Sequence, residues 1–282
     1  MWQLIAASFL FSFSFGLIGN RLAGLPPAWL AAARLMVAAA VFLPFARRVP
    51  LRTGAALFAV GMVQFGLMSL AYMTSFRFLA SHEVALFTVM TPLYVAVLHD
   101  LHRRAFHPAN LLAASLAVAG AALILWRGRL PGAPLTGFLL VEASNLCFAA
   151  GQLAYRAVTR AARAPLSDHQ VFFWLYLGGL TALLPFGLRD AVALAPRPTP
   201  AQLAALLYLG VMVSGLSYFL WNAGARRVPP GVLAVMNNVK IPLGMLVSLT
   251  CFGEPVRPAS LLAGGALVLA ALLPPLLRRE PA

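Results

Sequence analysis

Ten apolar stretches follow one another along this chain, and each is long enough to cross a lipid bilayer. Charged residues make up only 10% of the 282 residues, whereas soluble domains carry about 25%. A soluble core could not bury this much apolar surface, so each stretch is predicted to be a transmembrane helix of about 20 residues. The predicted spans are 2–19, 27–46, 53–75, 81–99, 108–126, 135–158, 169–188, 202–223, 231–251 and 258–277. The first is expected to be retained in the membrane, because no basic segment or cleavage site marks it as a signal peptide.

The second half of the chain repeats the first with an offset of 150 residues. Ser75–Leu123 aligns without a gap with Ala225–Leu273, so that Pro92 falls on Pro242. Five predicted helices per half is an odd number, so the second half must enter the membrane from the opposite side. We therefore expect an all-α membrane protein of ten transmembrane helices, arranged as two inverted five-helix repeats over residues 1–130 and 131–282.

Arginine accounts for 20 of the 21 basic residues, and the formal net charge is +14. Most of these arginines lie between the apolar runs and do not form one patch. This distribution favours contact with lipid headgroups over binding of nucleic acid. Twelve arginines lie in segments on the side of the membrane that holds both termini, and seven lie on the opposite side. The positive-inside rule then predicts a multi-pass protein of a bacterial-type inner (plasma) membrane with both termini in the cytoplasm. A monomer is expected, because the symmetry lies within one chain.

Two charged residues lie deep inside predicted spans. Lys240 is the only lysine of the chain and falls near the middle of the ninth span, and Glu142 falls about eight residues into the sixth. A charge at mid-bilayer costs on the order of 3 kcal/mol unless it is paired or hydrated. Lys240 is therefore a candidate for binding a substrate carboxylate, with a structural lysine as the alternative. Glu142 is a candidate for pairing with Lys240, for gating or for proton exchange, and the alternative is a packing carboxylate.

Further polar and aromatic side chains are candidates for the walls of a binding site. Asn145, Gln152 and Tyr155 share one helical face with Glu142, and they serve either a substrate or helix–helix hydrogen bonds. Asn237 lies one turn before Lys240. Tyr72 and Trp221 are candidate stacking surfaces, because they lie in the third and eighth spans, which correspond in the repeat.

Pro92 and Pro242 occupy equivalent places in the fourth and ninth spans. A proline inside a helix removes a backbone donor and leaves a carbonyl without its usual partner. Such a carbonyl is tolerated at membrane depth where it lines a cavity or finds another donor. The pair is therefore predicted to mark hinges near the site.

The sequence predicts no catalytic site, metal or cofactor. It contains no Walker A pattern, which argues against direct use of ATP by that route. His99, His102 and His107 cluster with Asp100, but their spacing is not that of a strong zinc motif, and solvated loop histidines are favoured.

Several of these features together resemble the EamA family of the drug/metabolite transporter superfamily. The residues that carry the resemblance are Arg34, Tyr72, Arg77, Thr91-Pro92-Leu93, Tyr218-Phe219-Leu220-Trp221, Pro242 and Gly253-Glu254-Pro255. The resemblance implies ten helices and a central cavity lined mainly by helices 1, 3, 4, 6, 8 and 9. It also implies export of amino acids or related metabolites. The first half departs from this pattern, with Arg103-Arg104 where the second half has Gly253-Glu254.

The function predicted from the sequence is secondary transport of a small molecule by alternating access. Export of amino acids, with aromatic or apolar side chains among the candidates, or of related small metabolites is expected. The alternatives are a membrane-embedded enzyme, which would need clustered catalytic groups at one membrane face, and a channel. The expected partners are the small-molecule substrate and membrane lipids, and the protein is not expected to be an enzyme.

Overall fold

The protein was analysed as a computed structural model, which describes residues 1–14, 17–22, 24–125, 134–162, 167–192, 198–251 and 257–277. The motif Gly253-Glu254-Pro255 lies outside these residues. So do six of the arginines in the charge count, namely Arg127, Arg129, Arg163, Arg197, Arg278 and Arg279.

The described residues form helices throughout. In chain order these are α1 (Trp2–Ser12), η1 (Leu17–Arg21), α3 (Pro27–Phe42), η2 (Leu43–Phe45), α4 (Leu51–Gly61), η3 (Met62–Leu67), α5 (Met68–Ser75), α6 (Ser81–Thr88), α7 (Thr91–Arg103), α8 (Pro108–Leu125), α9 (Leu135–Ala161), α10 (Asp168–Val192), α11 (Pro200–Tyr208), η4 (Leu209–Ser217), α12 (Tyr218–Ala225), α13 (Pro230–Cys251), α14 (Pro258–Ala270) and α15 (Leu273–Leu277). Five of them begin at a proline, whose fixed φ and missing N–H suit the first position of a helix.

The prediction of an all-α membrane protein is confirmed. Within the described ranges, nine helical segments are long and apolar enough to cross a membrane. They correspond to the second to tenth predicted spans. In place of the first predicted span, the structure has the shorter apolar helix Trp2–Ser12, followed by the π-helical turn η1.

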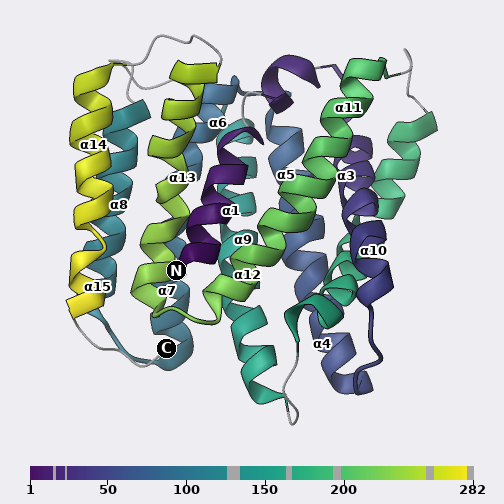
Figure 1. Cartoon of the computed structure of the whole chain (residues 1–282), viewed down its shortest axis with the longest axis horizontal. Coiled ribbons are helices and arrows are strands. Elements are labelled where there is room, and N and C mark those ends of the chain that lie inside the picture. Colours follow the sequence, from purple (N-terminus) through teal and green to yellow (C-terminus); the bar gives the residue numbers. More distant parts are fainter. Residues whose placement is uncertain are drawn as a thin grey trace.

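The helices form one bundle in which helices that are far apart in the sequence pack side by side (Figure 1). At one edge α8 packs against α14 and α13, and at the other edge α3 packs against α10 and η4. Between them, α9 packs against α5 and α7, while α1 packs against α12 and α13. The middle of the bundle is therefore built from α1, α5, α7, α9, α12 and α13.

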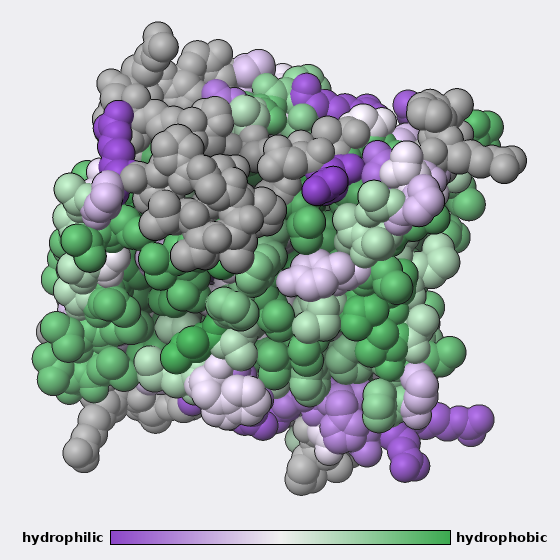
Figure 2. Space-filling model, turned by 45° about the horizontal axis from the view of Figure 1, so that its top comes forward, coloured by the Kyte–Doolittle hydropathy of each residue, from purple (hydrophilic) through white to green (hydrophobic). Residues whose placement is uncertain are grey.

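The outer surface is hydrophobic where it would face lipid. Figure 2 shows green, hydrophobic side chains across the middle of one face, with purple, hydrophilic side chains gathered toward the upper and lower margins. Large apolar residues are exposed on several helices, including Leu112 of α8, Leu188 of α10 and Leu262 of α14. A soluble protein rarely exposes such continuous apolar area, whereas lipid tails cover it without cost.

Two of the spans change helical type at mid-length, and another is broken. The third span passes from α4 through the π-helical segment η3 into α5, and the eighth passes from α11 through η4 into α12. The fourth span is broken between α6 and α7, directly before Pro92. The ninth span, α13, stays helical through Pro242. The two prolines therefore have different local structures.

Candidate functional site

A cavity lined by both polar and apolar side chains lies in the middle of the bundle. The first, third, fourth, sixth, eighth and ninth spans, which are the six that the resemblance implies, contribute to its lining, and so does α3 of the second span. The lining residues are Phe11, Ser14, Ile18, Arg34, Met68, Tyr72, Thr88, Thr91, Ser144, Asn145, Phe148, Val213, Tyr218 and Lys240. The volume that the centres of water-sized molecules can occupy in this cavity is about 80 Å³. One water molecule requires roughly 10–15 Å³ of such volume, so the cavity has several times the space that one water needs.

Lys240 enters this cavity from α13. Among the described residues, no hydrogen bond or ion pair reaches its ammonium group. The pairing of Lys240 with Glu142 that the sequence suggested is absent from the described residues, because Glu142 bonds to other groups. An ammonium group inside a bundle is tolerated only where it meets water, a protein partner or a ligand. Lys240 therefore presents three unused donors to whatever occupies the cavity.

Arg34 of α3 supplies a second cation, and it is held in place by the protein. Its Nε and Nη2 atoms donate to the Ser214 hydroxyl oxygen at 3.2 and 3.1 Å, and only 4% of the residue is exposed. Its guanidinium also lies close to the phenol groups of Tyr72 and Tyr218. Because Ser214 occupies one edge of the guanidinium, Arg34 is a fixed positive charge in the wall.

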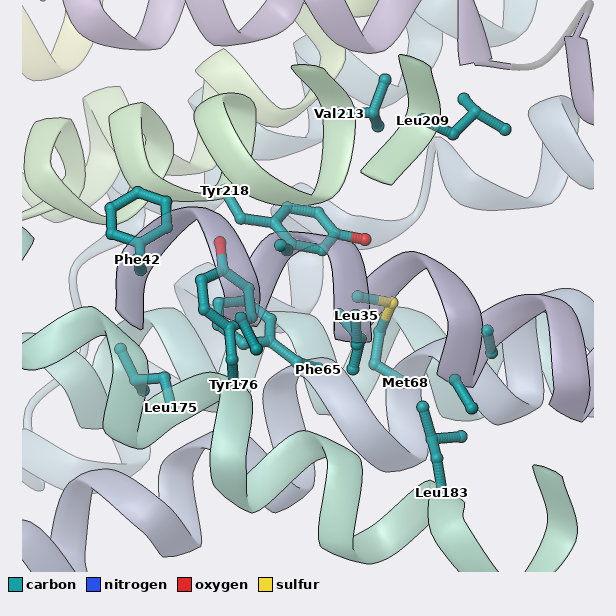
Figure 3. Close-up of a cluster of buried hydrophobic side chains, with 14 of the residues drawn as sticks. Leu35, Phe42, Phe65, Met68, Leu175, Tyr176, Leu183, Leu209, Val213 and Tyr218 are labelled. Carbon is teal, nitrogen blue, oxygen red and sulfur yellow. The ribbon is translucent and has the colours of Figure 1, made fainter. Parts of the chain in front are cut away.

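The π-helical segment η4 places Ser214 opposite Arg34. The Tyr176 hydroxyl donates to the Ser214 backbone oxygen at 2.6 Å and lies 3.1 Å from the Gly215 backbone oxygen. The ring of Tyr176 stacks on Phe65, and Phe65 stacks in turn on Tyr218, with ring centroids 5.3 and 4.9 Å apart (Figure 3). A π-helix leaves backbone carbonyls poorly paired, and π-helical turns are frequent at functional sites. Here a buried tyrosine completes the pairing and fixes the local register.

The break between α6 and α7 forms another part of the wall. Carbonyl oxygens at the break meet side-chain donors: the Thr91 hydroxyl donates to Thr88 at 2.8 Å and Asn238 Nδ2 to Val89 at 2.9 Å. Asn145 Nδ2 donates at 3.0 Å to the Phe87 oxygen, which also accepts from the Met90 backbone N–H. Irregular backbone at membrane depth is stable when neighbouring groups satisfy it in this way. The break thus turns Thr88 and Thr91 toward the cavity without leaving these carbonyls unsatisfied.

Glu142 lies directly behind the cavity wall. Its Oε2 atom accepts hydrogen bonds from the Tyr94 hydroxyl at 2.9 Å and from Asn145 Nδ2 at 3.2 Å. Asn145 itself lines the cavity, and its side-chain oxygen lies 3.1 Å from the Thr91 hydroxyl oxygen. Glu142 is therefore one hydrogen bond away from the cavity lining.

The remaining predicted site residues lie in the packed interior. Trp221 is buried and donates from its ring nitrogen to Gln152 Oε1 at 2.9 Å. Asn237 is fully buried and donates to the Leu233 backbone oxygen of its own helix. None of these three side chains lines the cavity, whereas Lys240, Asn145 and Tyr72 do.

The sequence did not single out Arg34, Thr88 or Ser144 as site residues, although all three line the cavity. Arg34 carried the same signal as Lys240, since it is an arginine inside an apolar run, and the cost of burying its charge pointed to a cavity. The small hydroxyl residues carried no such signal, because serine and threonine are common in transmembrane helices as packing groups.

The histidine cluster lies apart from the cavity lining. Ligand atoms of His99, Asp100 and His107 lie within 4.8 Å of one another. In the protein, Asp100 accepts hydrogen bonds from the backbone N–H of His107 at 2.8 Å and lies 2.7 Å from its Nδ1 atom. This network ties the end of α7 to the start of α8. His99 and His102 lie within α7 and not in a loop, contrary to the prediction of solvated loop histidines.

A helical membrane bundle with a cavity between its central helices that holds two cations is typical of transporters of small solutes. The chain belongs to the EamA-like transporter family, whose family model matches residues 1–126 and 135–274. It is a secondary transporter and not an enzyme, as the resemblance implied.

Comparison with known proteins supports the same family. The chain is 38% identical over 278 residues to a "Probable biotin transporter" of Pseudomonas aeruginosa, and the alignment covers 96% of each chain. It is 37% identical over 280 residues to a "Biotin transporter" of Escherichia coli K12, which covers 96% of this chain and 91% of that protein. A solved structure with 19% identity superposes with a TM-score of 0.80 over 99% of this chain and 98% of the other, which shows the fold alone.

Proposed function

We propose that this protein carries biotin, or a closely similar monoanionic carboxylate, across the membrane. The observation that carries the proposal is the pair of cations, Arg34 and Lys240, in one cavity whose described lining contains no aspartate or glutamate. A low-dielectric cavity with two positive charges attracts an anion strongly, because the surrounding helices screen little. The relatives named as biotin transporters point to which anion this is.

The lining suits the chemistry of biotin. Biotin has a carboxylate at the end of an apolar chain and a cyclic urea at the other end, which both donates and accepts hydrogen bonds. Lys240 offers unused donors for the carboxylate, and hydroxyl and amide groups of Thr91, Ser144 and Asn145 suit the urea. Phe148 and Met68 provide apolar contact for the rest of the molecule.

The same cavity disfavours the amino acids expected from the sequence. The α-ammonium group of an amino acid is stabilised most strongly by a carboxylate, and the described lining contains no aspartate or glutamate. Placed near Arg34 or Lys240, that group would be repelled, whereas biotin carries no positive charge. Amino acids therefore serve as the competing substrates in the test below.

The proposed mechanism is alternating access by two inverted five-helix repeats, residues 1–130 and 131–282. Support comes from the separate family matches to residues 1–126 and 135–274 and from the π-helical segments in both the third and the eighth spans. Pro92 and Pro242 are the proposed hinges. The helix is broken between α6 and α7, directly before Pro92, whereas α13 is continuous through Pro242. A hinge at Pro92 therefore has more structural support than a hinge at Pro242.

The proposed setting is a bacterial-type inner membrane, with both termini in the cytoplasm and the monomer as the working unit. The charge bias of the sequence supports this orientation. Export is the direction predicted from the sequence, and the direction of net flux under an imposed proton gradient tests it.

The decisive experiment reconstitutes the purified protein in liposomes and measures counterflow of radiolabelled biotin. A panel of unlabelled biotin, biotin amide, aromatic amino acids and apolar amino acids competes for the site. We expect saturable counterflow that biotin inhibits, biotin amide inhibits weakly and amino acids do not. Flux that does not saturate would indicate a channel, chemical conversion of biotin would indicate an enzyme, and competition by amino acids alone would overturn the substrate.

A further inference from the structure

We propose that Glu142 is the binding site of a co-transported proton, so that one proton accompanies each anionic substrate. This inference rests on the proposed function, because it requires an anion bound in the cavity. It assigns a second, chemically different ligand to the protein and a separate place at which that ligand binds.

The environment of Glu142 suits a carboxyl group that gains and loses a proton. Only 8% of the residue is exposed, and its Oε1 atom is buried with no hydrogen-bond partner among the described residues. Both hydrogen bonds that it accepts converge on the other oxygen, Oε2. A carboxylate with one bare oxygen inside a membrane bundle is costly, and a proton on Oε1 removes that charge. Oε2, which accepts both bonds, suits the carbonyl oxygen of the neutral acid.

The helices that surround Glu142 bring no countercharge into contact with it. The described titratable side chains on α9 and on the helices packed against it are Arg52, Tyr72, Glu83, Tyr94, His99, Asp100, His102, Arg103, Cys147, Tyr155, Arg156, Arg160 and Tyr218. Of these, only Tyr94 hydrogen-bonds to Glu142. Since no described cation pairs with the carboxylate, a proton is the ligand that neutralises it.

Asn145 connects this proton site to the substrate cavity. Its amide nitrogen is shared between Glu142 Oε2 and the Phe87 backbone oxygen, and its amide oxygen lies beside the Thr91 hydroxyl. A substrate that bonds to Asn145 or Thr91 changes the donors available to Glu142. The proton and the substrate therefore bind at separate but coupled places, which permits both to be bound at once. Simultaneous binding is the requirement for symport.

The charges also favour a ratio of one proton per substrate. Among the described residues, the cavity lining and the wall directly behind it hold two cations, Arg34 and Lys240, and the carboxylate of Glu142. Binding a monoanion and a proton together leaves the net charge of this set unchanged. Moving one extra charge through the membrane field costs about 2.3 kcal/mol per 100 mV, so an unchanged charge makes transport insensitive to the membrane potential.

The test uses proteoliposomes that contain a pH-sensitive dye, with protein-free liposomes as the blank. Addition of biotin outside should acidify the interior in a saturable way. An imposed gradient of one pH unit, alkaline inside, should accumulate biotin about 10-fold, since a factor of ten corresponds to about 1.4 kcal/mol. A potassium diffusion potential alone should drive no accumulation.

Glu142→Gln keeps an oxygen that can accept from Tyr94 and Asn145 but cannot release a proton. We expect this variant to retain biotin counterflow and to lose both the acidification and the pH-driven accumulation. Glu83→Gln is the matched control, because within the described part of the chain the Glu83 carboxylate accepts a single bond, from the Ala80 backbone at the start of α6. It should behave as the wild type does.

The outcomes separate the two proposals. Absence of biotin counterflow in the wild type removes the proposed function itself, whereas counterflow without proton movement overturns only the coupling. Proton movement that survives in Glu142→Gln overturns the assignment to Glu142. If this variant fails to fold, labelling of the wild type by a hydrophobic carbodiimide, which attacks protonated carboxyl groups, decides the matter. Labelling of Glu142 that declines as pH rises supports the site, and no labelling at any pH overturns it.

Discussion

Arg34 and Lys240 share one cavity, but their surroundings give them different roles. The Nε and Nη2 edge of Arg34 is occupied by Ser214, whereas the Lys240 ammonium has no partner among the described residues. A guanidinium that is already bonded sets the local potential, and an unbonded ammonium is available to a ligand. We therefore propose Lys240 as the residue that binds the substrate carboxylate and Arg34 as the residue that keeps the cavity positive.

Replacement of Lys240 by methionine should weaken biotin binding about 10- to 100-fold, because a hydrogen bond to a charged group contributes about 1.5–3 kcal/mol. The affinity is measured as the half-saturation of counterflow for biotin and for biotin amide, in the wild type and in Lys240→Met. The acid should lose its advantage over the amide in the variant. An equal loss for both compounds would indicate that Lys240 acts through folding and not through the carboxylate.

Helix irregularities position these residues. In a regular helix, Ser214 would be bonded only within its own span, but η4 leaves its backbone oxygen to Tyr176. The third span has its own π-helical segment, where Gln64 exchanges two hydrogen bonds with Asn222 of α12 at 2.8 and 3.0 Å. The π-helical segment η3 is thus joined to α12, and η4 is joined to α3 through Ser214 and Arg34.

The Tyr176 hydroxyl should be needed for this arrangement. Tyr176→Phe leaves the backbone oxygens of Ser214 and Gly215 without their side-chain donor, which should lower stability by about 1–3 kcal/mol. It should also weaken biotin binding, because Ser214 positions Arg34. Thermal unfolding in detergent and the counterflow assay measure the two effects. Tyr208→Phe is the control, since Tyr208 makes no hydrogen bond among the described residues; a Tyr176 variant that matches this control would contradict the role.

At the scale of the whole molecule, ion pairs near one end of the bundle connect helices that alternating access would move. Asp168, at the start of α10, accepts hydrogen bonds from the Tyr155 hydroxyl of α9 and from Arg226 after α12. Arg227 lies 3.9 Å from the same carboxylate and donates to Gln3 of α1. By the predicted orientation this network lies on the cytoplasmic side of the bundle.

The orientation itself can be tested with reporters fused to the C-terminus. Green fluorescent protein becomes fluorescent in the bacterial cytoplasm, and alkaline phosphatase becomes active only outside it. We expect a fluorescent fusion to the first and an inactive fusion to the second, because twelve arginines on the side of the termini outweigh seven on the other. Fusions placed after Arg77 should give the reverse pattern. An active C-terminal phosphatase fusion would invert the proposed orientation.

The sequence by itself determined the membrane fold, because apolar runs of about 20 residues have no other stable environment. It also singled out Lys240 and Glu142, because buried charge is costly wherever the helices pack. Only the tertiary structure decided which polar residues share the cavity. Helical periodicity assigns a residue to a face but does not say which neighbour that face meets. The π-helical segments and the break before Pro92 also change the faces locally. For these reasons Trp221 and Gln152 bond to each other in the interior, while Arg34 and Ser214, 180 residues apart, meet at the cavity wall.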